Sequence, residues 1–283
     1  SWMAKLKKHR NSRSKPGLDD KSLTSWNALM LTGYLDAYTA LGNEDYLNTG
    51  LKNANFIRTN LIIENGRLQR SYKNGKSSIN AYLEDYAFTI EAFIKLYEIT
   101  FDETWLELAE SLCEICIEDF SGDSSMFYFK SNKDRKLITR TIEIMDNVIP
   151  ASNSVMAKNL FKLSELLEKS DYKTRSEQML KSIQPQIISH PGSYSNWLDL
   201  MLNFTHPYYE VAITGSDAKN LNRSLQGKYL PNIIVAGSTT ESMVPLLQNR
   251  YQKNKNLIYV CNYGKCELPQ KSVEKAIDLI KQF

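Results

Sequence analysis

Ser25–Tyr46 reads SWNALMLTGYLDAYTALGNEDY, and Glu84–Trp105 reads EDYAFTIEAFIKLYEITFDETW. The two stretches align at an offset of 59 residues, which pairs Tyr38 with Tyr97. A third copy, Ala151–Tyr172 (ASNSVMAKNLFKLSELLEKSDY), follows at a further offset of 67. Each copy has a polar start, an apolar-rich run, a short polar break and a second run. The sequence therefore predicts three copies of one helical hairpin that stack on a shared core.

The first run of each copy carries apolar residues at helical spacing, whereas the second runs, near residues 46–60, 103–119 and 172–182, carry more charge. This asymmetry predicts inner first helices and outer second helices, and the short breaks make each pair antiparallel. The apolar stripes are Leu29, Met30, Gly33, Tyr34 and Ala37, then Ile90, Phe93, Ile94 and Tyr97, then Met156, Leu160, Leu163 and Leu167. A shorter helix near Ser195–Phe204 is expected to begin a fourth unit.

The pattern changes from about Tyr208. Three β-like runs, Tyr209–Thr214, Asn232–Ala236 and Leu257–Cys261, alternate with helical stretches. This alternation favours a βαβαβ arrangement with a parallel sheet. The intervening helices are expected at Ala218–Lys228 and Val244–Gln252, with a closing helix at Lys271–Gln282.

Three segments follow from these patterns. Residues 1–21 form a basic N-terminal arm, 22–207 an α/α-hairpin domain of the toroid type, and 208–283 an α/β C-terminal segment. We expect the arm to be solvated and partly disordered, with phosphate binding as the alternative. The whole chain has 35 Lys and Arg against 32 Asp and Glu, a formal net charge of only +3. This balance argues against nucleic acid as a partner.

Compartment and membrane contact follow from the same composition. No apolar run approaches the ~20 residues that span a bilayer, and the basic start lacks the apolar core of a signal peptide. Four cysteines in 283 residues do not form a disulfide scaffold. We therefore expect a cytoplasmic protein with reduced thiols and no membrane partner.

Long links between an outer helix and the next inner helix are expected to wall a pocket. Arg67–Asn80 alternates around Lys73-Asn74-Gly75, a hairpin pattern, and Met126–Phe129 predicts a short strand.

The starts of the inner helices are the candidate site. The repeat makes Trp26, Asp85 and Ser152 equivalent, and likewise Asn27, Tyr86 and Asn153. Equivalent positions in a ring of hairpins face a common axis, where helix amino ends offer free N–H groups. Carboxylates, amides and aromatic rings together suit a carbohydrate or polyol. The competing interpretation is that these polar residues are ordinary N-caps.

Two acidic pairs, Asp19-Asp20 and Glu84-Asp85, are the candidate catalytic groups. Adjacent helical residues do not face each other, so each pair offers the pocket at most one carboxylate. Glycoside chemistry needs two carboxyl groups about 5–10 Å apart. Asp20, Asp85 and Glu84 are therefore the catalytic candidates, and Asp19, Trp26, Asn27, Tyr86 and Asn153 the substrate-binding ones.

Cys261 and Cys266 form a C-x4-C motif at the end of the last predicted strand. Unpaired structural cysteines are the simplest interpretation; a redox pair is the alternative if the loop brings them together. Cys113 and Cys116 are expected to be packing residues. No motif calls for a cofactor, and no ligand set for a metal.

The chain resembles a known family at several ordered motifs. These are Pro16–Lys21 (PGLDDK) with Leu23–Asn27 (LTSWN), Leu83–Phe88 (LEDYAF), Pro150–Val155 (PASNSV), and the end of the chain around Cys261, Cys266 and Pro269. They are similar to the thioredoxin-domain-containing proteins of the YyaL and spermatogenesis-associated type. The resemblance implies a helical toroid related to six-hairpin glycosidases and N-acylglucosamine 2-epimerases.

The same resemblance implies a partner in the longer protein. It predicts an N-terminal thioredoxin-like domain and further hairpins, neither of which lies in these 283 residues. We thus expect a mostly α chain, an incomplete α/α toroid followed by a small α/β segment. The leading hypothesis is a glycosidase- or epimerase-like domain of carbohydrate metabolism. The alternatives are a non-catalytic binding or scaffold domain and a thiol-redox partner of the thioredoxin-like domain.

Overall fold

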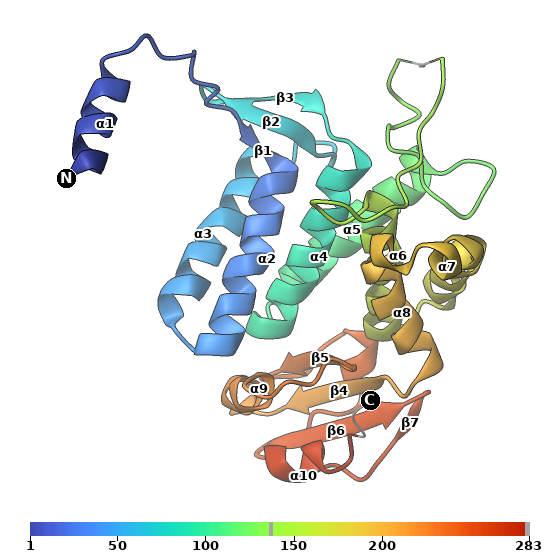
Figure 1. Ribbon diagram of the computed structural model, residues 1–283. Coiled ribbons are helices and arrows are strands. Elements are labelled where there is room, and N and C mark those ends of the chain that lie inside the picture. Colours follow the sequence, from blue (N-terminus) through green and yellow to red (C-terminus); the bar gives the residue numbers. More distant parts are fainter. Residues whose placement is uncertain (136–137, 281–283) are drawn as a thin grey trace.

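The computed structural model describes residues 1–135 and 138–280. Three antiparallel helical hairpins form its main body (Figure 1). The inner helices are α2 (Thr24–Leu41), α4 (Leu83–Thr100) and α6 (Ser152–Leu167), and the outer helices are α3 (Glu44–Asn60), α5 (Glu103–Phe120) and α7 (Ser170–Ser189). A short 3-10 turn, η1 (Pro191–Ser193), leads to α8 (Ser195–Thr205), which packs against α6 and α7. The three predicted hairpins and the shorter helix expected near Ser195–Phe204 are confirmed.

The junctions within the hairpins repeat the sequence offsets. Each inner helix ends on a left-handed residue, at Gly42 (φ 69°), Phe101 (φ 57°) and Glu168 (φ 53°). These positions are separated by the same 59 and 67 residues as the sequence copies. The left-handed residue turns the chain sharply, so that each outer helix begins two residues later and runs back antiparallel.

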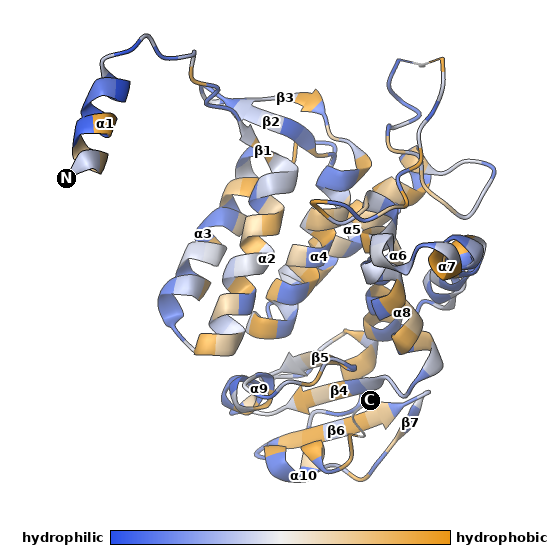
Figure 2. Ribbon diagram, in the orientation of Figure 1, coloured by the Kyte–Doolittle hydropathy of each residue, from blue (hydrophilic) through white to orange (hydrophobic). Residues whose placement is uncertain are grey.

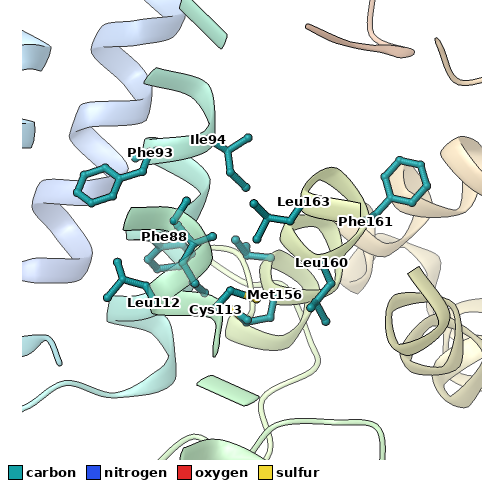
Figure 3. Close-up of a cluster of buried hydrophobic side chains, with 14 of the residues drawn as sticks. Phe88, Phe93, Ile94, Leu112, Cys113, Met156, Leu160, Phe161 and Leu163 are labelled. Atoms are coloured by element: carbon teal, nitrogen blue, oxygen red, sulfur yellow. The ribbon is translucent and has the colours of Figure 1, made fainter. Parts of the chain in front are cut away.

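The core lies between neighbouring inner helices. Figure 3 shows Phe88 and Ile94 of α4 facing Met156 and Leu163 of α6, with Cys113 of α5 beside them. In contrast, α3 buries only three of its residues, and its ribbon is mainly hydrophilic in Figure 2. α2 sits at the end of the row and leaves Trp26 and Met30 exposed, so the inner-helix array is open at this edge.

A small sheet covers one end of the inner helices. β2 (Gln69–Lys73) and β3 (Lys76–Asn80) form the predicted hairpin around Asn74-Gly75, and β1 (Ser22–Leu23) pairs with β2. The short strand expected at Met126–Phe129 is wrong, because this segment forms only an isolated bridge between Phe127 and Ser121.

The C-terminal segment is α/β, but its sheet is mixed. β4 (Tyr209–Thr214), β5 (Ile233–Ser238), β6 (Leu257–Asn262) and β7 (Lys265–Cys266) stand in the order β5-β4-β6-β7. β4 and β5 are parallel and joined through α9 (Ala218–Gln226), as expected. β6 runs antiparallel to β4, so the prediction of an all-parallel sheet is wrong.

The missing crossover helix explains the reversed strand. The helix expected at Val244–Gln252 is only a 3-10 turn, η2 (Pro245–Leu247). Consecutive parallel strands need a long crossover, usually helical; without that helix, β6 runs in the opposite direction to β4 and β5. The closing helix is also shorter than expected: α10 spans Val273–Ile277, and the predicted end at residues 281–282 lies outside the described residues.

The mixed sheet docks on the carboxyl ends of the inner helices, opposite the small sheet (Figure 1). Asn222 and Gln226 of α9 donate to the Glu98 carbonyl of α4 at 2.7 and 2.9 Å, and Arg223 donates to the Gly42 carbonyl at 2.9 Å. Terminal carbonyls of a helix have no partner within the helix, so α9 supplies the donors that they lack.

The N-terminal arm is exposed throughout residues 1–21, as expected. Trp2–Asn11 nevertheless forms a helix, α1, that buries none of its residues and stands apart from the body (Figure 1).

Gly237 of β5 gives a test of the docking. A methyl group there would lie 2.2 Å from two ring carbons of Phe101, the left-handed residue after α4. We expect Gly237→Ala to lower the free energy of unfolding by about 1–3 kcal/mol, since one of the two elements must move. Urea unfolding measures it. The control is Gly227→Ala, whose added methyl meets nothing closer than 3.6 Å; equal midpoints for both variants would contradict the close packing.

Candidate functional site

The amino ends of α2, α4 and α6 lie at the end of the molecule that carries the small sheet and the long segment between α5 and α6 (Figure 1). Thr24 Oγ1 donates to the Gln69 carbonyl at 2.5 Å, which fixes the first turn of α2 against β2. We call this region the helix-end mouth, defined by Trp26, Arg70, Glu84, Asp85, Glu143 and Ser152.

Asp85 ties two inner helices together. Its carboxylate accepts the Tyr82 N–H at 2.9 Å, which closes a capping box at the start of α4, and the Ser25 N–H of α2, also at 2.9 Å. The side chain is fully buried, and burial raises its pKa to about 6, although Arg70 and the two N–H donors oppose the shift. Because three donors occupy its oxygens, Asp85 holds Arg70 and the first turn of α2 in place. This structural role agrees with the N-cap interpretation.

Arg70 of β2 bridges the acidic pair. Its Nη1 lies 2.7 Å from Glu84 Oε1 and 3.0 Å from Asp85 Oδ2, and its guanidinium stacks 4.6 Å from the centre of the Tyr82 ring. The hairpin therefore brings one cation to two neighbouring carboxylates, both of which contact its Nη1. Glu84 keeps 13% of its side-chain surface exposed, so its carboxylate is the member of the pair that a ligand can reach.

Glu143 brings a further carboxyl group to the mouth. It accepts the Ser152 hydroxyl of α6 at 3.1 Å. Burial raises its pKa, the Ser152 hydrogen bond opposes that, and the negative charge of Glu84 raises it further. Glu143 holds its proton to a higher pH than a free glutamic acid, whereas Glu84 is paired with a cation.

Hydrogen bonds hold the segment around Glu143 against the start of α6 and against α8. Asp146 accepts the Ala151 N–H at 3.0 Å, the Ser154 hydroxyl at 2.7 Å and the Asn196 N–H at 2.9 Å. The Trp197 indole donates to the Ile144 carbonyl at 2.8 Å. These bonds hold a long connection without regular structure against α6 and α8, which gives Glu143 a defined position.

Aromatic surface flanks the carboxyl groups. Trp26, in the first turn of α2, is 66% exposed, next to the Ser25 N–H that binds Asp85. Tyr82 and Phe129 stack with ring centres 5.0 Å apart and line a cavity of 530 Å³. The other lining residues are polar or basic: Lys130, Ser131, Asn132, Asp134, Arg135, Arg140 and Thr141.

The predicted acidic pair Asp19-Asp20 lies apart from this cluster. Asp20 forms an ion pair with Lys73 at the tip of the β2–β3 hairpin, and Asp19 pairs with Lys21 at 3.2 Å. Both carboxylates are largely exposed. The structure therefore brings Glu84 and Asp85 to the mouth with Trp26 but gives Asp20 a different partner.

All three residues of the second aligned trio, Asn27, Tyr86 and Asn153, form hydrogen bonds with backbone groups. The Tyr86 hydroxyl accepts the Leu68 N–H at 3.0 Å, and Asn153 both accepts from and donates to the backbone of Phe127. Asn27 donates to the carbonyl of Leu23 at 2.8 Å. Tyr86 and Asn153 are buried, so they anchor the segments that precede α4 and α6.

The four cysteines divide into two pairs. Cys113 and Cys116 are free and buried in α5, as expected for packing residues. Cys261 and Cys266 form a disulfide, so the expectation of unpaired, reduced thiols is wrong for this pair. The β6–β7 hairpin sets them directly opposite each other, a geometry that the spacing in sequence did not reveal.

Sequence reasoning missed Arg70 and Glu143. Arg70 sits in a strand whose orientation depends on the pairing of β1 with β2, and Glu143 lies in a segment without periodicity. The arginine had one usable signal: alternation in Arg67–Asn80 puts it on a defined face of the hairpin.

Within residues 1–135 and 138–280, no group of three His, Cys, Asp or Glu side chains is arranged to hold a metal ion. No helix in the same ranges is long and apolar enough to cross a membrane.

The relatives of the chain agree with the motifs in its sequence. No family model matches it. An uncharacterized protein of Caenorhabditis elegans is 28% identical over 97% of the chain and 40% of the relative, and human spermatogenesis-associated protein 20 is 27% identical over 95% and 37%. The resemblance to the spermatogenesis-associated proteins is therefore confirmed. The chain spans about two fifths of the length of these relatives.

Solved structures share the fold. An α-mannanase of glycoside hydrolase family 76 from Bacteroides thetaiotaomicron superposes with a TM-score of 0.54 at 16% identity, over 82% of this chain and 66% of the mannanase. A sugar epimerase from a ruminal bacterium gives 0.51 at 19% identity, over 62% and 47%. The predicted fold class, an incomplete α/α toroid with toroid-type glycosidase and epimerase neighbours, is confirmed.

Proposed function

We propose that this homologue of spermatogenesis-associated protein 20 is a carbohydrate-active, glycosidase- or epimerase-like domain that binds a sugar or polyol in the helix-end mouth. The observation that carries the proposal is a pair of carboxyl groups at the amino ends of the inner helices, each with a different partner: Glu84 contacts Arg70, and Glu143 accepts the Ser152 hydroxyl. Arg70 forms an ion pair with Glu84, while burial raises the pKa of Glu143, which therefore retains a proton more readily. A proton donor opposite a carboxylate is the pairing that glycoside and sugar chemistry use.

The roles follow from the contacts. Glu143 would give a proton to a leaving or ring oxygen, and Glu84 would stabilise positive charge or take a proton. Asp85, enclosed by three donors, would position Arg70 and the start of α2. Of the residues that the sequence nominated, we retain Glu84 as catalytic and Asp85 as positioning, and we replace Asp20 with Glu143.

The ligand class follows from the surfaces beside the carboxyl groups. The exposed face of Trp26 suits the apolar face of a sugar ring, and Arg70 and the Ser152 hydroxyl suit its hydroxyl groups. The names of the toroid neighbours, an α-mannanase and a sugar epimerase, point to the same class. We place the activity in cytoplasmic carbohydrate metabolism.

A non-catalytic binding or scaffold domain is the second candidate. Three hairpins are half of a six-hairpin ring, and α2 leaves Trp26 and Met30 exposed at the open edge. In the longer protein, further hairpins and a thioredoxin-like domain would be the partners of this edge.

A ligand screen tests the proposal. The chain is heated with a panel of mono- and disaccharides and polyols, and at a concentration of ~100 times the dissociation constant a ligand adds about 2.7 kcal/mol of stability. Trp26→Ala should weaken binding of the active compound about tenfold, the ~1.4 kcal/mol of one stacked ring. Tyr229→Ala, which removes another exposed ring, is the matched control and should bind as the wild type does.

Product analysis separates the two candidates. A bound sugar that is converted by the wild type but not by Glu143→Gln supports the enzyme, and one that is recovered unchanged supports the binding domain. If no compound in the panel raises the melting temperature, or Trp26→Ala and Tyr229→Ala bind equally, the helix-end mouth is not a sugar site.

A further inference from the structure

The Cys261–Cys266 disulfide lines a second cavity, separate from the helix-end mouth. The two cysteines are cross-strand partners in the β6–β7 hairpin, whose turn is Tyr263-Gly264 with φ of 50° and 73°. The cavity has a volume of 270 Å³ and lies between this hairpin and the junction of α6 with α7.

The two sulfur atoms differ in access. Cys261 is 1% exposed, in the body of β6, whereas Cys266 lies on the exposed edge strand β7. Thiol–disulfide exchange requires a thiolate to approach one sulfur in line with the bond. Cys266 Sγ is the atom that an incoming thiolate can reach, and Cys261 Sγ is then the leaving group.

Arg250 places a positive charge at the sulfur atoms. Its Nη1 donates to Cys261 Sγ at 3.0 Å and to Cys266 Sγ at 3.1 Å. The residue is held in place, because the hydroxyls of Thr214 and Tyr259 donate to its carbonyl at 3.2 and 2.9 Å. A cation beside a sulfur stabilises the thiolate and makes it a better leaving group.

A carboxyl group completes the cavity. Glu210 of β4 is the cross-strand partner of Cys261 on its other side, and both side chains line the cavity. Burial raises the pKa of Glu210, and a hydrogen bond shared with Glu165 raises it further. Lys173 lies 2.7 Å from Glu165 and balances one negative charge of the pair. Glu210 is therefore placed to hold a proton beside the leaving sulfur.

We propose that Cys261, Cys266, Arg250 and Glu210 form a thiol–disulfide exchange site that accepts electrons from a dithiol. The dithiol's thiolate attacks Cys266 Sγ; the Cys261–Cys266 bond breaks, and its electron pair stays on Cys261 Sγ beside Arg250. Glu210 then gives a proton to Cys261. The second thiol of the reductant, as thiolate, attacks the reductant's own sulfur in the mixed disulfide and releases Cys266 as a thiolate. Cys266 and Glu210 each take a proton from solvent, which replaces the two protons that the reductant thiols lost on ionising. Two electrons thus pass to the cysteine pair, and the reductant leaves as a disulfide.

Alkylation of the intact chain tests the proposal. Protein purified without reductant and denatured in N-ethylmaleimide should gain two labels, on Cys113 and Cys116, and protein first treated with dithiothreitol in the folded state should gain four. Arg250→Gln should slow this reduction about three- to tenfold, since the leaving thiolate loses its cation. Arg250→Lys should restore most of the rate.

Lys265→Gln is the matched control. It removes a positive charge next to Cys266 in sequence, from a residue that does not line the cavity, and should reduce at the wild-type rate. A variant that unfolds globally would expose the buried Cys113 and Cys116 to labelling in the absence of denaturant. If Arg250→Gln unfolds in this way, Glu210→Gln is used in its place and is also expected to slow reduction. Four labels on the untreated protein, or equal reduction rates for Arg250→Gln and the wild type, would overturn the exchange site.

Discussion

Replacing Arg70 with leucine should lower the free energy of unfolding by about 3–5 kcal/mol at pH 7.5, the cost of leaving a buried charge without its partner. Asp85 is fully buried, and Arg70 is the cation that contacts it at 3.0 Å. The same substitution frees Glu84, so the mouth should lose sugar binding as well as stability.

The loss at Arg70 should depend on pH. The folded-state pKa of Asp85, about 6, lies above its ordinary 3.8, so between pH 4 and 6 the folded chain binds more protons than the unfolded one. Stability from this group is therefore highest at low pH and falls as the pH rises through that interval. Arg70 lowers the pKa of Asp85, so without Arg70 the pH range over which stability falls extends to higher pH.

Urea unfolding at pH 5 and pH 7.5 measures both effects. Arg70→Leu should cost clearly less at pH 5, where Asp85 is protonated. Lys73→Leu is the matched control on the same strand: its partner Asp20 is exposed, so its unfolding midpoint should stay near that of the wild type. A loss at Arg70 that is equal at both pH values would show that Asp85 is not the group involved.

Replacing Asn153 with leucine should cost about 2–4 kcal/mol, because two buried backbone groups lose their partners at once. Asn153 Oδ1 accepts the Phe127 N–H at 2.8 Å, and Nδ2 donates to the Phe127 carbonyl at 2.9 Å. The loosened segment also carries Glu143, so sugar binding should weaken together with stability.

Hydrogen exchange at the Phe127 amide locates the change. The amide should exchange much faster in Asn153→Leu, while amides in the middle of α4 keep their protection. Asn55→Leu is the control: this exposed asparagine donates to the Leu51 carbonyl of its own helix, and its replacement should be close to neutral. Unchanged exchange at Phe127 would show that Asn153 does not anchor the segment.

The hairpins could be predicted because their determinants are local. Apolar spacing and short polar breaks act within about twenty residues, and the left-handed residues Gly42, Phe101 and Glu168 recur at the offsets of the sequence copies, 59 and 67. The strand positions of the C-terminal segment were also readable from their β-like runs. The direction of β6 was not, because it depends on whether residues 244–252 form a crossover helix.

The site was predictable only where it coincides with the repeat. Trp26, Glu84 and Asp85 lie at helix starts, which the alignment of copies marks. Arg70 and Glu143 reach the mouth through strand pairing and through the bonds of Asp146, contacts between segments far apart in the chain. Likewise, the pairing of Cys261 with Cys266 follows from a two-residue turn, which the sequence spacing alone left open.

The docking of α9 on the inner helices imposes an order on biosynthesis. Residues 24–205 leave the ribosome before α9 is made, and their contacts are local enough to collapse early. Until residues 222–237 have been synthesised, water must hydrogen-bond to the Glu98 and Gly42 carbonyls, and the Phe101 ring lacks its contact with Gly237. The nascent chain thus passes through a stage in which the hairpins have formed but the carboxyl ends of the inner helices still expose these carbonyls and the Phe101 ring. A chaperone would recognise the chain in this state.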